Sequence, residues 1–390
     1  MNWIISELFY PDEVSTAQIL TDIALKKIDK GEVNVICGPS GYEKSYNTQK
    51  KELDSRVKIH RIDLPSLDKN KIIQRILRLL LLTLKMSWAI LVKVKKRDEV
   101  FLTTNPTFLI ITIAVLKKIK GFKLEILVHD VFPENLVPAG LIKQDSFKYR
   151  LLSKIYNSSY RKADRIIVLG EDMKELLERK IAPKAGRIDV IPNWSDNDIH
   201  PITDFNMSEY LGVNVDNKVV FGFAGNLGRV QGVLEFIDLF TRAANPDLAL
   251  VIIGDGALRS EIQKKIKYED LQPVHYLGPK PRMEQNLFLN ACDIGVVTLI
   301  DGMKGLGVPS KTYNLLAAGK PLFYIGDHNS EIDTYVKKYD CGWSFTWAKE
   351  SEILSFLKGL PGKSNEVSEK GVNALKASKN YEKDNVLNLF

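Results

Sequence analysis

The chain has 390 residues. A single hydrophobic core rarely organises so many residues, so this length predicts two domains. Hydrophobic residues make up 45% of it and charged residues 26%, which is ordinary for a globular protein. The three cysteines, Cys37, Cys292 and Cys341, are too far apart for a disulfide framework or a zinc site, so we expect a reducing compartment.

The N-terminus and the apolar segments argue against a secretion signal and a membrane span. Residues 1–13 lack a basic start and carry Glu7 inside their apolar stretch, unlike a signal peptide. The longest uncharged run, residues 100–116, is interrupted by Asn105-Pro106. We therefore expect no membrane-spanning helix.

Charge is distributed unevenly along the chain. Residues 1–195 hold 34 Lys and Arg against 23 Asp and Glu, a net charge of +11, whereas residues 196–390 hold 21 against 25, a net charge of −4. This asymmetry predicts an anionic partner for the first half only, either a membrane surface or a nucleic acid.

In the first half, short β-branched runs alternate with helical patterns, as in a parallel sheet covered by helices. We expect strands at residues 33–37, 57–62, 99–103, 124–128, 165–168 and 188–191. We expect helices at, among others, residues 17–28, 108–118 and 145–163. Residues 191–195 contain Pro192 and Asn193 and are interpreted as a linker.

The segment from Lys69 to Arg97 contains no acidic residue. Its nine basic residues are Lys69, Lys71, Arg75, Arg78, Lys85, Lys93, Lys95, Lys96 and Arg97. On a helix, most of them share one side, and the other side mainly carries Leu77, Leu80, Leu81, Leu84, Trp88 and Leu91. This pattern predicts docking to an anionic membrane surface, unless the charged side is simply solvated and the apolar side packs on the sheet. Nucleic-acid binding is less favoured, because the segment has a single Trp rather than repeated aromatic platforms.

The same alternation restarts in the second half. We expect strands at residues 218–224, 248–253, 274–277, 293–297 and 321–324, each followed by a helix. Two successive units of this kind predict an α/β protein with two doubly wound parallel sheets, rather than one large sheet. We place the domains at residues 1–195 and 196–377. Ligands of such sheets bind beyond the carboxyl ends of the strands.

A glycine-rich turn, residues 225–232, connects the first strand of the second half to a helix. Glycines allow a tight turn with exposed N–H groups, and the helix N-terminus favours an anion. Arg229 adds a forked cation that suits a diphosphate. A purely structural turn is an equally good interpretation of the glycines alone.

A second segment, residues 305–321, combines glycines with Pro309, Ser310 and Lys311 at the start of a helix. A lysine is unfavourable at a helix N-terminus unless an anion is bound there. Lys311 is therefore a candidate anion ligand, and a solvated surface lysine is the alternative.

Several sequence motifs in order resemble the retaining glycosyltransferases of family 4. They are PNW (192–194), GNLGRVQG (225–232), GDG (254–256), YLGPKPRMEQNLFLNACDIGVV (276–297) and GVPSKTYNLLAAGKP (307–321). Residues 9–38 and 128–142 resemble the bacterial capsule, O-antigen and colanic-acid branch of that family. The resemblance implies the GT-B fold, two Rossmann-like domains facing a central cleft, with a segment of about residues 378–390 that crosses back to the first domain.

The resemblance also implies roles for individual residues. The donor would contact Gly225, Asn226, Gly228, Gly254, Gly256, Pro279, Lys280, Gly307, Pro309, Ser310, Thr312 and Asn314. The acceptor would approach Asp12, Glu13, Ser15 and Thr16. The catalytic candidates are His129, Asp130, Arg229 and Lys311, with Asp130 positioning or deprotonating the acceptor hydroxyl and an Asp–His cap of a strand as the alternative.

The chain departs from the family pattern in its acidic and basic residues. Many members carry two glutamates where this chain has Leu306 and Asn314, and Leu306 cannot hydrogen-bond a sugar hydroxyl. The usual cations of the phosphate loop are replaced by Asn226 and Gln231, and the glycine-rich N-terminal loop is replaced by residues 14–16.

The function that these features predict is transfer of a hexosyl or N-acetylhexosaminyl group from a UDP-sugar to a saccharide or lipid-linked saccharide. The resemblance implies retention of configuration. We expect no metal and no other cofactor, since Lys311, Arg229 and helix N-termini can stabilise the leaving diphosphate. Asp196-Asn197-Asp198 is a minor metal candidate. We expect a cytoplasmic enzyme, peripherally associated with the inner face of the cytoplasmic membrane. The alternatives are a sugar-nucleotide 2-epimerase of the same fold and a non-catalytic nucleotide-binding protein.

Overall fold

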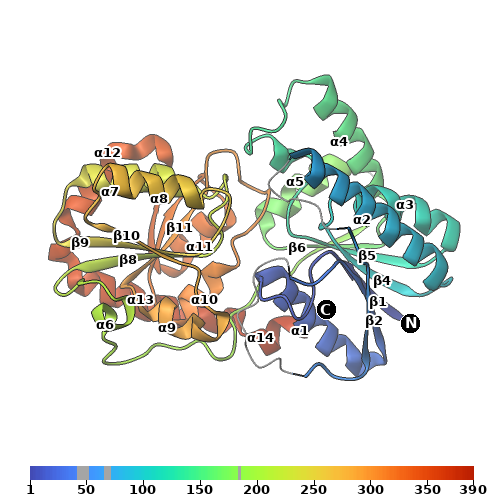
Figure 1. Cartoon of the computed structure of the whole chain (residues 1–390), viewed down its shortest axis with the longest axis horizontal. Coiled ribbons are helices and arrows are strands. Elements are labelled where there is room, and N and C mark those ends of the chain that lie inside the picture. Colours follow the sequence, from blue (N-terminus) through green and yellow to red (C-terminus); the bar gives the residue numbers. More distant parts are fainter. Residues whose placement is uncertain (42–51, 66–71, 183–185) are drawn as a thin grey trace. The chain divides into compact units, whose positions relative to one another are not determined.

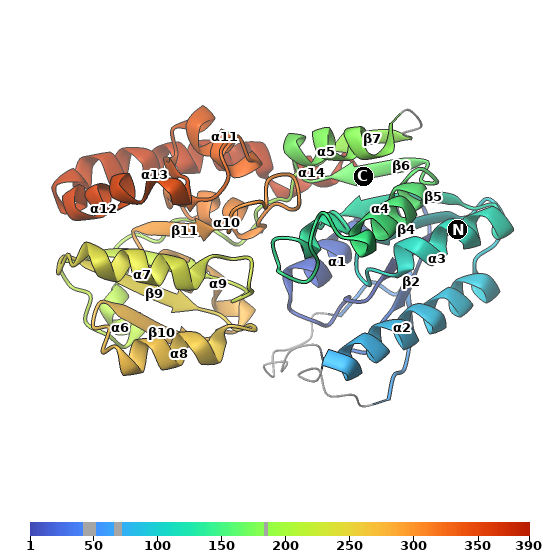
Figure 2. The same cartoon turned by 90° about the horizontal axis from the view of Figure 1, so that it is seen from above.

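The computed structural model describes residues 1–41, 52–65, 72–182 and 186–390. The chain forms two compact units, which we describe separately (Figures 1 and 2). Unit 1 contains Met1–Pro192, Gly305–Gly307 and Val386–Phe390, and unit 2 contains Asn193–Lys304 and Val308–Asn385. Each unit is a parallel sheet with helices on both faces, which confirms the predicted α/β class with two doubly wound sheets.

Unit 1 has a seven-stranded sheet in the order β3-β2-β1-β4-β5-β6-β7, all of whose pairings are parallel. Its strands are β1 (Asn2–Ser6), β2 (Val33–Cys37), β3 (Val57–Arg61), β4 (Glu99–Thr103), β5 (Lys123–Val128), β6 (Arg165–Val168) and β7 (Arg187–Val190). Its helices are α1 (Ser15–Lys27), η1 (Ile28–Lys30), α2 (Ile72–Lys93), α3 (Leu109–Lys120), η2 (Glu134–Leu136), α4 (Phe147–Tyr160) and α5 (Glu171–Ile181). Helix α1 covers one face, and α2 to α5 cover the other (Figure 1).

Unit 2 has a six-stranded sheet in the order β10-β9-β8-β11-β12-β13. Its strands are β8 (Val219–Ala224), β9 (Leu248–Ile253), β10 (Val274–Gly278), β11 (Ile294–Thr298), β12 (Leu322–Ile325) and β13 (Gly342–Phe345). Its helices are α6 (Met207–Leu211), α7 (Val233–Ala243), α8 (Arg259–Tyr268), η3 (Arg282–Glu284), α9 (Gln285–Asn290), α10 (Lys311–Ala317), α11 (Glu331–Tyr339), η4 (Trp347–Lys349), α12 (Glu350–Gly359), η5 (Leu360–Lys363), α13 (Ser364–Ser378) and η6 (Lys379–Tyr381), followed by α14 (Lys383–Leu387), which continues into unit 1. Helices α7 and α8 lie on one face, and α9 and α10 on the other (Figure 1).

The core of unit 2 is rich in phenylalanine where α7 packs on the sheet. Phe221 of β8 contacts Phe240 of α7 and Phe323 of β12, with ring centroids 5.4 Å apart in both pairs. All three rings are buried, so this side of the sheet is fixed by large interlocking side chains.

Two strands were not predicted from the sequence. β1 carries the buried Trp3, Ile4 and Ile5 at the centre of its sheet, but it begins at the second residue and has no turn before it to mark its start. β13 is a four-residue edge strand that begins with Gly342 and contains no β-branched residue, so it lacks the β-branched run from which the other strands were predicted.

The end of the chain returns to unit 1. The Phe390 ring lies edge-on to Phe101, with centroids 6.0 Å apart, and the Arg165 guanidinium donates to the Leu389 carbonyl at 3.1 Å. Residues 386–390 therefore belong to unit 1, whereas residues 378–385 belong to unit 2. Within the described parts of the chain, no helix is both long enough and apolar enough to cross a membrane.

Candidate active site

In unit 2, the glycine-rich loop after β8 is held against the loop after β9. The Gly225 N–H donates to the Ile253 carbonyl at 2.9 Å, and the Leu227 N–H donates to the Asp255 carbonyl at 2.8 Å. A Cβ atom on Gly254 would lie 1.8 Å from the Gly225 carbonyl oxygen, and one on Gly256 would lie 2.6 Å from the Leu227 backbone. Gly254 and Gly256, predicted as donor residues, are thus required for close packing of the two loops.

The side chain of Lys311, at the first position of α10, lies beside this loop. A Cβ on Gly225 would be 3.8 Å from Lys311 Cδ, and Lys311 Nζ lies 3.3 Å from the centroid of the Phe223 ring. The Nζ atom is buried and has no hydrogen-bond partner among the described residues. Burial lowers the pKa of Lys311 well below its ordinary value. A cation–π contact offsets only part of the cost of burying an ammonium group, so this position would be stabilised by an anion.

Two further features surround the loop. Arg229 is exposed and makes no hydrogen bond or ion pair with any described residue. No side chain caps the N-terminus of α7, which begins after Gly232 (φ 63°). The Trp347 indole donates to the Leu299 carbonyl at 2.7 Å, and its ring would contact a Cβ on Gly232 at 2.7 Å. The loop therefore joins a free cation to uncapped helix N–H groups.

Asn314, predicted to contact the donor, is engaged within unit 2. Its carbonyl oxygen accepts from the Asp196 N–H at 2.8 Å, and its amide donates to Asp196 Oδ2 at 3.1 Å. Arg282 donates to the same carboxylate oxygen at 2.6 Å. The Asp196 carboxylate is therefore paired with a cation and an amide.

Other predicted donor residues are more dispersed. Lys280 Nζ lies 5.3 Å from the centroid of the ring of Tyr210, a residue of α6. Thr312 is buried, and its hydroxyl has no hydrogen-bond partner in the described structure. Gly307 belongs to unit 1 together with Leu306, which is 5% exposed at the position of a family glutamate.

In unit 1, His129 and Asp130 follow β5 directly at the carboxyl edge of the sheet. Their backbone N–H groups both donate to Thr104 Oγ1, at 3.2 and 3.3 Å. His129 Nε2 is buried without a partner among described residues, and burial lowers the pKa of the imidazole to about 4, so it is neutral at pH 7. The Asp130 side chain reaches solvent, yet the surrounding protein atoms raise the pKa of its carboxyl to about 6.

The predicted acceptor loop differs from residue to residue. Asp12 is buried, and its Oδ1 accepts from the Gly41 N–H at 2.8 Å, while Oδ2 is buried without a partner among the described residues. Ser15 begins α1 and is exposed, and Glu13 and Thr16 are half-buried. Asp12 therefore holds the loop, and Ser15 is its exposed residue at the start of α1.

One ion pair at this edge was missed, and it corrects the prediction for α2. The Arg78 guanidinium donates to the carboxylate of Glu7, which follows β1, and the two side chains are 13% and 4% exposed. Arg78 does not belong to a solvent-facing basic side of α2. No local sequence pattern marks the pair, because its members are 71 residues apart.

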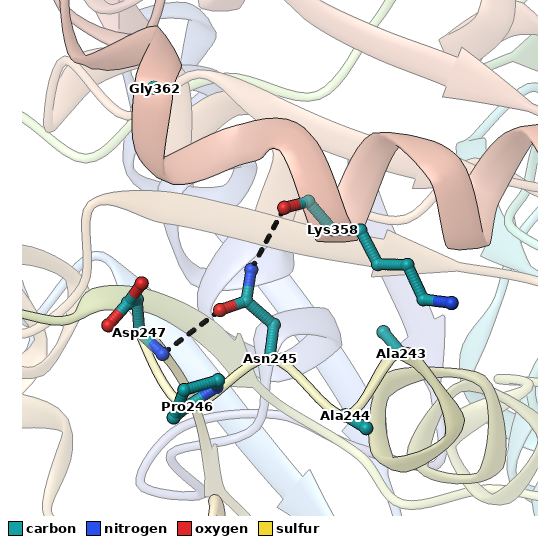
Figure 3. Close-up of a pocket in the computed structure, with 7 residues that line it drawn as sticks. All are labelled: Ala243, Ala244, Asn245, Pro246, Asp247, Lys358 and Gly362. Atoms are coloured by element: carbon teal, nitrogen blue, oxygen red, sulfur yellow. Dashed lines mark hydrogen bonds between the residues drawn. The ribbon is translucent and has the colours of Figure 1, made fainter.

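A separate cavity of about 430 Å³ lies between the end of α7 and the end of α12 (Figure 3). Asn245 closes its wall by donating to the carbonyls of Leu357 and Lys358 at 3.0 and 3.2 Å. The cavity precedes β9 and is thus at the amino end of that strand, opposite to the edge where ligands of such sheets bind.

Comparisons with known proteins agree with the fold and the motifs. The family model "Glycosyl transferase 4-like domain" matches residues 29–194, and "Glycosyl transferases group 1" matches residues 212–352. The probable glycosyltransferase WbjE of Pseudomonas aeruginosa is 36% identical over 286 residues, covering 72% of this chain and 70% of that protein. The chain belongs to the glycosyltransferases.

Together with the two-domain fold, these matches show a family-4 enzyme with the GT-B fold. The Escherichia coli K12 protein provisionally named colanic acid biosynthesis glycosyl transferase WcaI is 23% identical over 216 residues, covering 53% of this chain and 51% of that protein. The structure of Anabaena HepE in complex with UDP-glucose has a TM-score of 0.70 and 17% identity, covering 100% of this chain and 98% of HepE. The structural likeness shows the fold, and the sequence matches show a glycosyltransferase of glycan biosynthesis.

Proposed function

We propose that this glycosyltransferase moves a hexosyl or N-acetylhexosaminyl group from a UDP-sugar to a lipid-linked saccharide in surface polysaccharide biosynthesis, with retention of configuration. The observation that carries the donor part is the buried ammonium group of Lys311, which has no hydrogen-bond partner among described residues. A nucleoside diphosphate would supply the missing anion. Cleavage of the sugar–phosphate bond leaves negative charge on that diphosphate, and a preorganised cation stabilises it without rearrangement.

The neighbouring groups support the same assignment. Arg229 offers a forked cation, and the uncapped N-terminus of α7 offers N–H groups. Together with Lys311, these groups can hold a diphosphate without a metal ion, as we propose here. HepE, which has the same fold, binds UDP-glucose, and this supports UDP as the nucleotide.

For the acceptor, we assign Asp130 the task of positioning or deprotonating the attacking hydroxyl, with His129 beside it. With a pKa of about 6, the Asp130 carboxyl is ionised at neutral pH but is more basic than an ordinary carboxylate, as a general base requires. Glu13, Ser15 and Thr16 would contact the saccharide. The resemblance of the N-terminal unit to the capsule and O-antigen branch, together with the match to WcaI, supports a lipid-linked acceptor and an enzyme at the inner face of the cytoplasmic membrane.

The donor assignment is tested by thermal shift with UDP, GDP, TDP and CMP on the wild type, Lys311→Ala and Lys264→Ala. Lys264 is exposed on α8 and serves as the matched control. We expect UDP alone to raise the melting temperature of the wild type and the control, and to leave Lys311→Ala unchanged. A shift for another nucleotide would reassign the base, and no shift with any nucleotide would favour a non-catalytic protein.

Product analysis separates the two catalytic alternatives. A transferase releases UDP only when a saccharide acceptor is present, whereas a 2-epimerase converts the UDP-sugar without an acceptor. Conversion without an acceptor would therefore refute the transferase proposal while leaving the donor site intact.

A further inference from the structure

Helix α2 exposes an apolar face to solvent. Its inner face packs in unit 1 through Leu82, Met86 and Ile90, which are fully buried. The opposite face carries exposed apolar side chains, with exposed fractions between 45% and 77%: Ile73, Ile76, Leu77, Leu80, Leu84, Trp88 and Val92. Their spacing of three and four residues places them in one stripe along the whole helix. Packing of these leucines on the sheet, the alternative that the sequence left open, is contradicted by the exposure of Leu77, Leu80 and Leu84.

The neighbouring helix enlarges this surface. The Ser87 hydroxyl of α2 donates to Thr112 of α3 at 2.8 Å, so the two helices lie side by side, as Figures 1 and 2 also show. On α3, Val115 and Ile119 are one turn apart and 59% and 65% exposed. We call the outward stripe of α2 together with Val115 and Ile119 the α2–α3 patch. Large exposed apolar patches are uncommon on soluble monomers and mark interaction sites.

The charge next to the patch has one sign. No acidic residue occurs between Lys69 and Arg97, and several basic residues there are exposed: Lys85, Lys93, Lys95, Lys96 and Arg97. Arg78 is not among them, because it pairs with Glu7. Lys69, Lys71 and the side chain of Arg75, which the sequence analysis included, lie outside the described residues. Basic side chains that flank an apolar stripe complement anionic lipid headgroups.

We infer that the α2–α3 patch binds the surface of an anionic lipid bilayer, with α2 lying in the plane of the interface and its apolar side chains inserted among the lipids. The 22 residues of α2 would extend about 33 Å along that surface. Trp88 suits the boundary between headgroups and acyl chains. The apolar stripe, rather than a basic side of the helix, makes the central contact. This inference rests on the proposed function, since the enzyme would bind the membrane in order to reach its lipid-linked acceptor.

A second copy of the chain is a poorer partner for this patch. A symmetric dimer would bring the same surface of both copies together. The basic residues of the two copies would then share one interface without any acidic residue from this segment to pair with them. A bilayer that contains anionic lipid supplies both the apolar interior and the opposite charge.

The test is co-sedimentation of the full chain with vesicles of phosphatidylcholine containing 30% phosphatidylglycerol, compared with pure phosphatidylcholine. The variant Leu84→Ser/Trp88→Ser changes two exposed side chains, so folding should be unaffected. Val372→Ser/Leu375→Ser, on exposed positions of α13, is the matched control. We expect the α2 variant to bind the anionic vesicles at least about tenfold more weakly and the control to bind like the wild type.

The inference would be overturned by equal binding of the α2 variant and the wild type, or by a lipid-free dimer that the α2 variant dissociates. High salt should weaken binding but not abolish it, because insertion of apolar side chains is not screened; complete loss in salt would refute insertion. The UDP thermal shift of the α2 variant keeps this test separate from the donor assignment. Loss of vesicle binding with an intact UDP shift concerns the patch alone, whereas a missing UDP shift in the wild type with intact vesicle binding refutes the donor site alone.

Discussion

The two units differ in whether the cations near the carboxyl edges of their sheets have partners. In unit 1, Arg78 is paired with Glu7, and the Arg61 guanidinium donates to the carbonyls of Tyr10 and Gly38. In unit 2, the ammonium group of Lys311 is buried without a hydrogen-bond partner among the described residues. A paired cation stabilises the fold, whereas a buried cation without an anion costs free energy in the folded state. This difference supports the proposal that an anionic donor binds at the edge of unit 2.

Replacing Lys311 with methionine should have the largest effect on activity. We expect kcat/KM to fall by about 10²–10³-fold, because the leaving diphosphate loses a preorganised cation. The free energy of unfolding without ligand should stay equal or rise, because the buried ammonium group is removed and the apolar stem is kept. Steady-state kinetics and urea denaturation measure the two quantities. A large loss of stability would mean that Lys311 has a structural partner and would break the comparison.

Replacing Arg78 with methionine should lower the stability of the fold, the reverse of the effect expected for Lys311→Met. The change leaves the Glu7 carboxylate buried without its cation, so we expect the free energy of unfolding to fall by about 3–5 kcal/mol. Lys93→Met, an exposed cation on the same helix, is the control and should change stability little. If Arg78→Met and Lys93→Met are equally stable in urea denaturation, the Glu7–Arg78 pair is not important for the fold.

The pH dependence of activity tests the assignment of Asp130. If its carboxylate is the base, activity falls as the pH drops through a midpoint of about 6, and at pH 5 it should be about tenfold below the plateau. His129, with a pKa of about 4, stays neutral over this range and adds no second inflection. Asp130→Asn should remove most activity and the inflection, whereas Asp145→Asn, an exposed carboxylate in the same unit, should keep both. An unchanged profile in Asp130→Asn would exclude it as the base.

Some features of the candidate donor site could be predicted from the sequence and others could not. Lys311 and the glycine-rich loop were found because local chemistry marks them: a cation at a helix start and glycines at a strand end. The reason for Gly254 could not be found in this way, because it is the backbone of Gly225, from a different strand, that leaves no room for a Cβ. The donor roles assigned to Gly254 and the other predicted residues remain predictions.

Helix α2 shows a different limit. A helical projection gives the angle between side chains correctly, but it does not say which side faces the sheet. The projection therefore grouped Arg78 with solvent-facing lysines, and it left open whether Leu84 and Trp88 pack on the sheet. Burial of Leu82 and Met86 decides the orientation, and it depends on contacts with strands that are distant in the sequence.

Replacing Arg229 should have the smallest effect, and its size sharpens the comparison between buried and exposed cations. Arg229 is solvated before any ligand binds, so part of its attraction for a diphosphate is screened. We expect Arg229→Ala to raise the donor KM about three- to tenfold and to matter less at high salt, whereas the effect of Lys311→Met should be nearly independent of salt. Arg229→Lys distinguishes charge from geometry: recovery of the wild-type KM means that charge suffices, and no recovery means that the forked guanidinium is needed.

Arg242→Ala, which removes an exposed pair with Glu350 on the far end of α7, is the control and should leave the donor KM unchanged. Equal salt dependence for Arg229→Ala and Lys311→Met would show that both cations meet the donor in the same solvated environment, and the contrast drawn from burial of Lys311 would then be wrong.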